Sequence, residues 1–84
     1  MPYIKKVDRL KFKKTLEHIL PPHTAGELNY CLSCICQLYL LYAGESYQTH
    51  NDIMGALSGV QQEWYRRKVA PYEEKKIKEN GDIF

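Results

Sequence analysis

The stretch that decides the fold is LNYCLSCICQLYLLYA, which occupies residues 28–43. No charged residue occurs in it, and its apolar side chains recur at the three- and four-residue spacing of a helix. That stripe consists of Leu28, Cys31, Ile35, Leu38, Tyr39 and Tyr42. Three further apolar residues, Tyr30, Leu40 and Leu41, project away from the stripe on a helical wheel. Because a helix that is apolar all round is buried all round, we expect this helix to be central in an all-α fold.

Both ends of this helix carry start and stop signals. Thr24 and Glu27 have the three-residue spacing of a capping box, in which a hydroxyl and a carboxylate satisfy amide groups of the first turn. Gly44 follows the last apolar residue and suits the left-handed conformation that commonly ends a helix. The predicted helix therefore begins after Thr24 and ends before Gly44.

A helix is also predicted before this one, over residues 6–20. It is expected to stop at Pro21 and Pro22, because proline lacks the amide donor and restricts the residue before it. Its incomplete apolar stripe consists of Leu10, Leu16, Ile19 and Leu20, with Phe12 beside it.

The third predicted helix begins at Thr49, where Asp52 gives a weaker version of the capping box. Its stripe consists of Ile53, Ala56, Leu57, Val60 and Trp64. We expect it to stop or kink near Ala70, since Pro71 follows.

Pro71 suits the first position of a short fourth helix over residues 71–79, with Gly81 as its cap. The expected architecture is an all-α, compact bundle of three main helices and this short C-terminal one. The length of 84 residues allows a single domain, residues 1–84.

The size of the chain predicts an oligomer. Chains this short usually need a disulfide, a metal or a partner copy to complete their core. Three cysteines crowded into six residues are not a disulfide framework, and no export signal opens the chain. We therefore expect a second copy to bury part of the 28–43 helix; the alternative is a central helix wrapped by its own neighbours. The uncharged stretch is about 16 residues long and holds polar side chains, which argues against a membrane span.

The three cysteines, Cys31, Cys34 and Cys36, suggest a zinc site only superficially. A zinc site needs a fourth ligand and normally a turn between paired cysteines, whereas these lie inside a helical pattern. No nucleophile is paired with a base, and no two carboxylates have a recognisable acid–base arrangement. We expect no metal, no cofactor and no enzymatic activity.

Charge is nearly balanced, at a net +2, so a strongly electrostatic nucleic-acid binder is not the leading hypothesis. The first 14 residues are the exception, because they contain six positively charged residues and one negatively charged residue, Asp8. The positively charged residues are Lys5, Lys6, Arg9, Lys11, Lys13 and Lys14. They form either a solvated helix face or a contact surface for nucleic acid or another anionic partner.

Arg66 and Arg67 are the candidate anion-binding residues. Arg67 falls close to the apolar stripe of the third helix, whereas Arg66 points away from it. A guanidinium that faces a core must be paired, and Glu63, one turn earlier, is the nearest partner, with Glu27 as a second. The alternatives are a structural Glu–Arg pair and an arginine that binds carboxylate or phosphate in an interface cleft.

Tyrosine is abundant, with seven residues, and it offers a flat apolar surface with a polar tip. Such side chains suit either interface packing or stacking on a nucleobase. Neutral polar residues near them could supply hydrogen bonds to the same ligand. The predicted ligand-binding residues are Arg66, Arg67, Tyr47, Thr49, Asn51, Asn29, Tyr65 and Tyr72.

Seven segments form a recognisable combination, and they are residues 1–4, 27–30, 47–52, 55–57, 65–67, 70–77 and 79–82. Together they resemble a family of small phage and prophage proteins of unknown function, and the similarity covers nearly the whole chain. The cysteine-rich part of the 28–43 helix departs from the pattern. The resemblance implies a phage origin and a location in the host cytoplasm, and it supplies no activity.

Small phage proteins of this size are commonly inhibitors, adaptors or regulators. By analogy of class, the leading hypothesis is an anti-defence protein that sequesters a nucleotide-derived immune signal between subunits without turnover. The alternative is an adaptor or inhibitor that binds a host protein or nucleic acid through the basic N-terminal helix.

Overall fold

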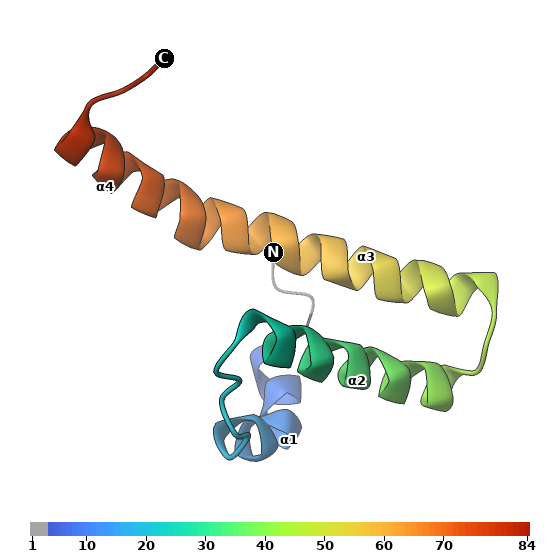
Figure 1. Cartoon of the computed structure of the whole chain (residues 1–84). Coiled ribbons are helices and arrows are strands. Elements are labelled where there is room, and N and C mark those ends of the chain that lie inside the picture. The colour runs from blue at the N-terminus through green and yellow to red at the C-terminus, as the bar shows by residue number, and fades with distance from the viewer. Residues whose placement is uncertain (1–3) are drawn as a thin grey trace. The chain divides into compact units, whose positions relative to one another are not determined.

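The computed structural model describes residues 4–84, and that part of the chain is helical without strands, which confirms the all-α class. In chain order its elements are α1 (Lys6–Glu17), α2 (Ala25–Ala43), α3 (Tyr47–Trp64), the π-helical turn η1 (Tyr65–Val69) and α4 (Ala70–Asn80) (Figure 1). The chain divides into two units, Met1–Leu38 and Tyr39–Phe84, which are described separately. Residues 1–3 of the opening segment that carries the family resemblance lie outside the described residues.

Helix α1 ends at Glu17, three residues before the predicted end. The amide of His18 closes the last turn by donating to the carbonyl oxygens of Lys14 and Thr15, both at 3.3 Å. The residues that follow lead into Pro21 and Pro22, and a residue before proline is driven out of the helical conformation. The helix therefore ends further before the prolines than the apolar pattern predicted.

The start of α2 confirms the capping box. The Glu27 amide donates to Thr24 Oγ1 at 3.0 Å. The Glu27 carboxylate accepts from the amide of His23 at 2.8 Å, one residue further back than the usual partner. At the other end, Gly44 has a φ of +81° and its amide donates to the Leu40 carbonyl at 2.8 Å, so the predicted cap is confirmed.

Helix α3 begins at Tyr47, so the predicted start at Thr49 is wrong. Ser46 is the N-cap, with extended backbone, and its Oγ accepts a hydrogen bond from the Thr49 amide at 3.0 Å. Thr49 thus stands in the third helical position, where its amide needs such an acceptor. Asp52 does not reach back to cap the helix; its carboxylate accepts from Gln48 and Tyr39 instead.

Of the predicted stop or kink near Ala70, the stop is wrong, because α3, η1 and α4 form one continuous helix over residues 47–80 (Figure 1). At η1 the amide of Ala70 donates to the Tyr65 carbonyl, five residues back. Proline in a regular helix clashes with the carbonyl four residues earlier, and a wide π turn just before it relieves that conflict. The short fourth helix is therefore the end of a long one, about 50 Å in length. It ends at Gly81, as predicted, where φ is +86°.

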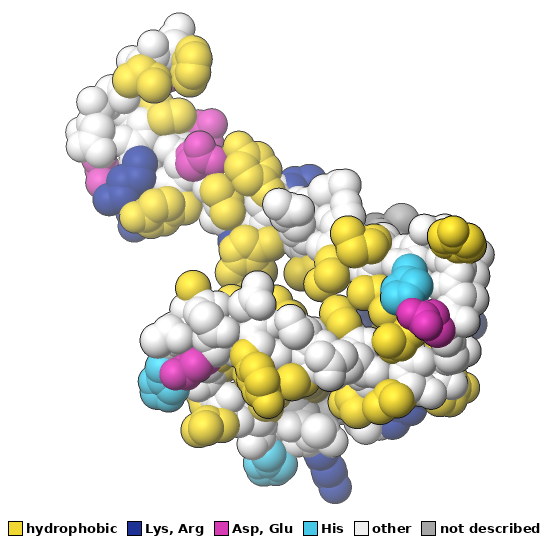
Figure 2. Space-filling model, turned by 45° about the vertical axis from the view of Figure 1, so that its right-hand side comes forward, with side chains coloured by type: hydrophobic (Ala, Val, Ile, Leu, Met, Phe, Trp, Pro, Cys, Tyr) yellow, Lys and Arg dark blue, Asp and Glu magenta, His cyan; other side chains and the backbone are white. Residues whose placement is uncertain are grey.

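Burial differs most from expectation. Among residues 4–84 no apolar side chain is buried, and Thr49 is the one buried residue. On α2, Leu41 and Tyr42 are 80% and 91% exposed. Hydrophobic side chains accordingly appear at the surface in the view of Figure 2. The prediction that α2 is buried all round is therefore not confirmed by the exposure of its side chains.

Candidate ligand-binding site

The predicted ligand-binding residues fall into separate places. Tyr47, Thr49 and Asn51 lie in the first turns of α3. The π turn holds Tyr65 and both arginines, and Tyr72 follows in α4. Along a continuous helix, Thr49 and Arg66 are roughly 25 Å apart. Asn29 lies on α2, in the first unit. One chain therefore does not gather all eight side chains into one pocket.

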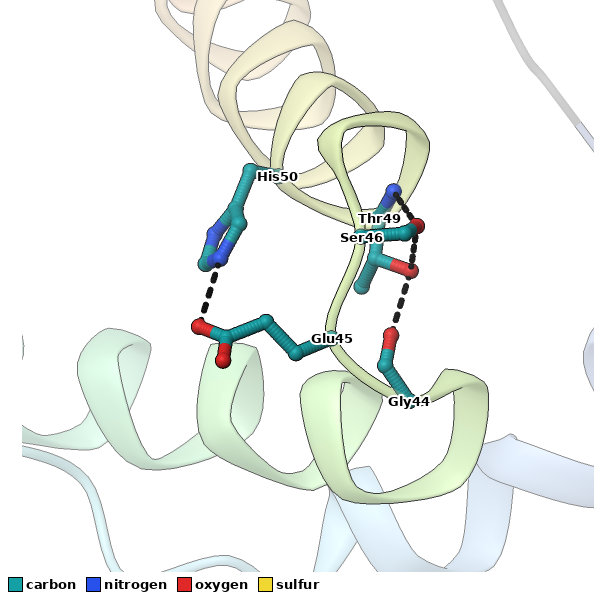
Figure 3. A network of polar contacts seen from close by, with 5 residues as sticks. All are labelled: Gly44, Glu45, Ser46, Thr49 and His50. Carbon is teal, nitrogen blue, oxygen red and sulfur yellow. Dashed lines mark hydrogen bonds and ion pairs between the residues drawn. The ribbon is translucent and has the colours of Figure 1, made fainter.

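Thr49 belongs to a capping network at the turn between α2 and α3 (Figure 3). Its hydroxyl donates to the Gly44 carbonyl at 2.6 Å and lies 3.1 Å from Ser46 Oγ. The residue is only 4% exposed. Nearby, His50 Nε2 lies 3.1 Å from the Glu45 carboxylate. The Thr49 hydroxyl is thus committed to the turn, and its role there is to hold α3 to the end of α2.

The π turn positions the two arginines on one carboxylate. Arg66 Nη2 donates to both Glu63 oxygens, at 3.2 and 3.0 Å, and Arg67 Nε donates to Oε2 at 2.8 Å. The arginine side chains are 65% and 61% exposed, and that of Glu63 is 31% exposed. Two guanidinium groups on one carboxylate leave an excess positive charge at the surface.

The predicted Arg67–Glu63 pair is confirmed. Arg66, which was expected to point away from the apolar stripe, binds the same carboxylate. Spacings of three and four residues both bring side chains together on one face of a helix. Glu27, the second predicted partner, caps α2 instead.

Two tyrosines flank the arginines along the helix. Tyr65 forms a hydrogen bond with Glu73, and this bond raises the pKa of the Tyr65 phenol above its ordinary value. Lys76 Nζ lies 5.5 Å from the centre of the Tyr72 ring and 3.0 Å from Glu79 Oε2. Sequence reasoning missed Glu73 and Lys76. The four-residue spacing of Tyr72 and Lys76 could have found the latter.

The cysteines of α2 show no metal-binding arrangement. They are free and half-buried, and no group of three metal-ligating side chains occurs in the part of the chain that the structure describes. Tyr30 forms a hydrogen bond with Cys34, which raises the pKa of the Tyr30 phenol. No helix between residues 4 and 84 has the length and apolarity that a membrane crossing requires.

Tyr39 predicts a pH dependence of stability. Its Oη donates to Asp52 Oδ2 at 2.9 Å, and this bond raises the pKa of Tyr39 above 10.0. Because the folded state holds the phenol proton more tightly, the stabilisation is complete below the unfolded pKa and is lost as pH rises through the folded one. We expect the melting temperature of the wild type to fall more steeply than that of Tyr39→Phe between about pH 9 and about pH 11, followed by circular dichroism. Parallel curves for the two proteins would contradict the role of this bond.

Comparison with known proteins identifies the family of this chain and assigns no activity to it. A family model described as a domain of unknown function, DUF6899, matches residues 1–83. The searches found no matching curated protein and no matching solved structure. Since the match spans nearly the whole chain, the protein belongs to the DUF6899 family.

Proposed function

We propose that this chain is a non-catalytic binding protein that holds a phosphate-bearing, nucleotide-derived ligand and works as a homo-oligomer. The observation that carries the proposal is the coincidence of Tyr65, Arg66 and Arg67 with the π turn. Such turns are rare, and they are frequently found at functional sites. Here both guanidinium groups bind a single carboxylate at the surface.

The chemistry of this cluster suits a phosphate. Arginine presents a planar fork of donors that matches phosphate oxygens, and the Glu63 carboxylate occupies the place that an anionic oxygen of a ligand would take. A phosphate group with a higher charge would compete with that carboxylate for the same donors. Tyr65 and Tyr72, 55% and 59% exposed, offer ring surface to a base nearby.

This proposal keeps four of the eight predicted ligand-binding residues as the core of the site. Tyr65, Arg66, Arg67 and Tyr72 carry it, and Thr49 is assigned to the turn that it caps. The remaining predicted residues, Tyr47, Asn51 and Asn29, take part only where a second copy brings them to the arginines. Oligomerisation would then create a concave site that one small chain lacks.

Calorimetric titration with inorganic pyrophosphate, ADP-ribose and a cyclic dinucleotide tests the proposal. We expect Arg66→Gln and Arg67→Gln each to weaken binding by roughly tenfold to a hundredfold, the loss of one charge-assisted contact. Glu63→Gln has the opposite expected effect, because it removes the competing carboxylate from both arginines.

The matched control is Lys68→Gln, which removes one positive charge from the same turn. We expect it to change binding by less than threefold or so, an effect of net charge alone. The proposal would be contradicted by an absence of binding below millimolar ligand, or by equal losses of affinity in Lys68→Gln and Arg67→Gln. Glu63 and the arginines would then have a structural role only.

The biological setting belongs to the same proposal. We propose that the chain works in the cytoplasm of a phage host, which is supported by the resemblance of several segments to small phage and prophage proteins. A protein that holds a nucleotide signal without turnover would there act against a nucleotide-dependent defence.

The second candidate function is an adaptor that uses α1. This helix carries an excess of basic residues, and the ion pair that Lys13 forms with Glu17 is long, at 3.9 Å. Reversal of charge at Lys11, Lys13 and Lys14 separates the two functions. Loss of nucleic-acid binding in a salt-dependent gel shift, with the arginine variants unaffected, would favour the adaptor.

A further inference from the structure

We propose that Asn80 is a site of spontaneous deamidation, in which the backbone nitrogen of Gly81 attacks the Asn80 side chain. Asn80 is the last residue of α4, and Gly81 caps the helix with a φ of +86°. The contacts involved lie at this end of α4, so ligand binding and assembly play no part in the reaction.

The reaction consumes water and releases ammonia. The Gly81 nitrogen bonds to Cγ of Asn80, the Cγ–Nδ2 bond breaks, and the proton of the Gly81 nitrogen leaves with the ammonia. The cyclic imide that results joins the Gly81 nitrogen to both carbonyl carbons of residue 80. One water molecule then opens the imide. Cleavage at Cγ leaves an aspartate side chain, and cleavage at the main-chain carbonyl carbon leaves isoaspartate.

The residue that follows each asparagine decides where the attack can occur. The chain has three asparagines, and only Asn80 is followed by glycine. Glycine has no Cβ, so its nitrogen approaches the preceding side chain without hindrance. Tyrosine follows Asn29 and aspartate follows Asn51, and both asparagines lie inside helices, α2 and α3. Deamidation is therefore expected at Asn80 before the other two.

One hydrogen bond restrains the reaction at Asn80. The Gly81 amide donates to the Ile77 carbonyl at 2.8 Å, so the attacking nitrogen is held by the last turn of α4. Residues 81–84 are not helical, and no further turn continues the ladder beyond this bond. Helix ends open at free energies near zero, whereas interior turns open at higher cost. The attack thus occurs in molecules whose last turn has opened.

The products destabilise the same turn. A carboxylate at residue 80 lies beside Glu79 and near the carbonyl oxygens that give a helix C-terminus its partial negative charge. Lys78, the basic residue of the last turn, offsets part of that repulsion. Isoaspartate also adds a methylene to the main chain and shifts the Gly81 amide out of register with Ile77. Deamidation therefore shortens α4.

Peptide mass spectrometry of the whole chain, incubated in water labelled with heavy oxygen, tests this inference. We expect labelled acid at Asn80 to accumulate roughly tenfold faster, or more, than at Asn29 and Asn51, because only Asn80 lies in an end turn. Gly81→Ala should slow the reaction by about tenfold, a barrier higher by about 1.4 kcal/mol, although it weakens the cap. Equal rates at all three asparagines, or an unchanged rate in Gly81→Ala, would overturn the inference.

Met54→Asn is the matched control, because it places an asparagine before Gly55 inside α3. The same dipeptide then stands in an interior turn, and we expect it to react roughly tenfold more slowly than Asn80 in the same molecule. Equal rates at both sites, with the helical circular dichroism of the variant unchanged, would show that opening of the last turn does not control the reaction. Deamidated protein, separated by ion exchange, should have less helical ellipticity than fresh protein, and equal ellipticity would contradict the shortening of α4.

Discussion

Replacement of Thr49 by valine is expected to lower the free energy of unfolding by about 1–3 kcal/mol, because it removes a hydroxyl that is buried and hydrogen-bonded. That hydroxyl donates to the Gly44 carbonyl at 2.6 Å and lies 3.1 Å from Ser46 Oγ, so the carbonyl loses its donor and the serine hydroxyl loses a hydrogen-bond partner. Valine fits the same space and leaves the polar groups of the turn without their partner. For a domain of this size the melting temperature should fall by roughly 5–20 °C.

Thr49→Ser is the matched control, since it keeps the hydroxyl and removes only the methyl group. We expect serine to retain most of the wild-type stability, with both variants followed by circular dichroism at one protein concentration. Equal losses for valine and serine would assign the effect to packing, and an unchanged valine variant would show that the network does not hold the turn.

The helix ends show how far the sequence predicts this fold. Thr24 and Glu27 lie at the start of α2 with the spacing that the capping box requires, and Gly44 lies at its end. These signals act within a few residues, so the local sequence is sufficient to place them. The start of α3 was missed because Ser46 and Thr49 both suit an N-cap, and only the structure shows which of them accepts the amide.

The π turn could not be predicted in the same way. Pro71 indicates that a regular helix is disturbed, but a break, a kink and a π turn all relieve the conflict with its ring. The chain uses the π turn, and the phase of every side chain beyond Trp64 changes with it. Arg67 was paired correctly with Glu63 from its four-residue spacing, and Arg66 has the three-residue spacing that also brings side chains together on a helix.

The ligand-binding residues were predicted from a different kind of evidence. Tyr47 and Arg67 were grouped by residue type and by their nearness to helix ends, without a distance between them. The continuous helix separates these two ends of α3 within one chain. A grouping by chemistry alone therefore overstated how many of the eight side chains one copy could bring to a ligand.

Substitution of Gly44 by alanine is expected to destabilise the fold by about 1–2 kcal/mol, the cost of a left-handed conformation for a residue with a side chain. Its φ is +81°, and no atom lies within 4 Å of the position that a Cβ would take. The cost is therefore conformational and not steric. The melting temperature should fall by roughly 5–15 °C.

Gly55→Ala separates this cost from a general effect of losing a glycine. Gly55 lies inside α3, where an added Cβ also meets open space and the backbone is not left-handed. Alanine there should raise the free energy of unfolding by about 0.4–1 kcal/mol, because the unfolded chain loses more freedom than the helix does. The two substitutions are chemically identical, so their expected effects of opposite sign isolate the conformation at Gly44. Stabilisation in both, measured by thermal unfolding, would show that the turn after α2 adopts another conformation in solution. A loss at Gly55 alone would instead indicate that this part of α3 is covered in the assembled protein.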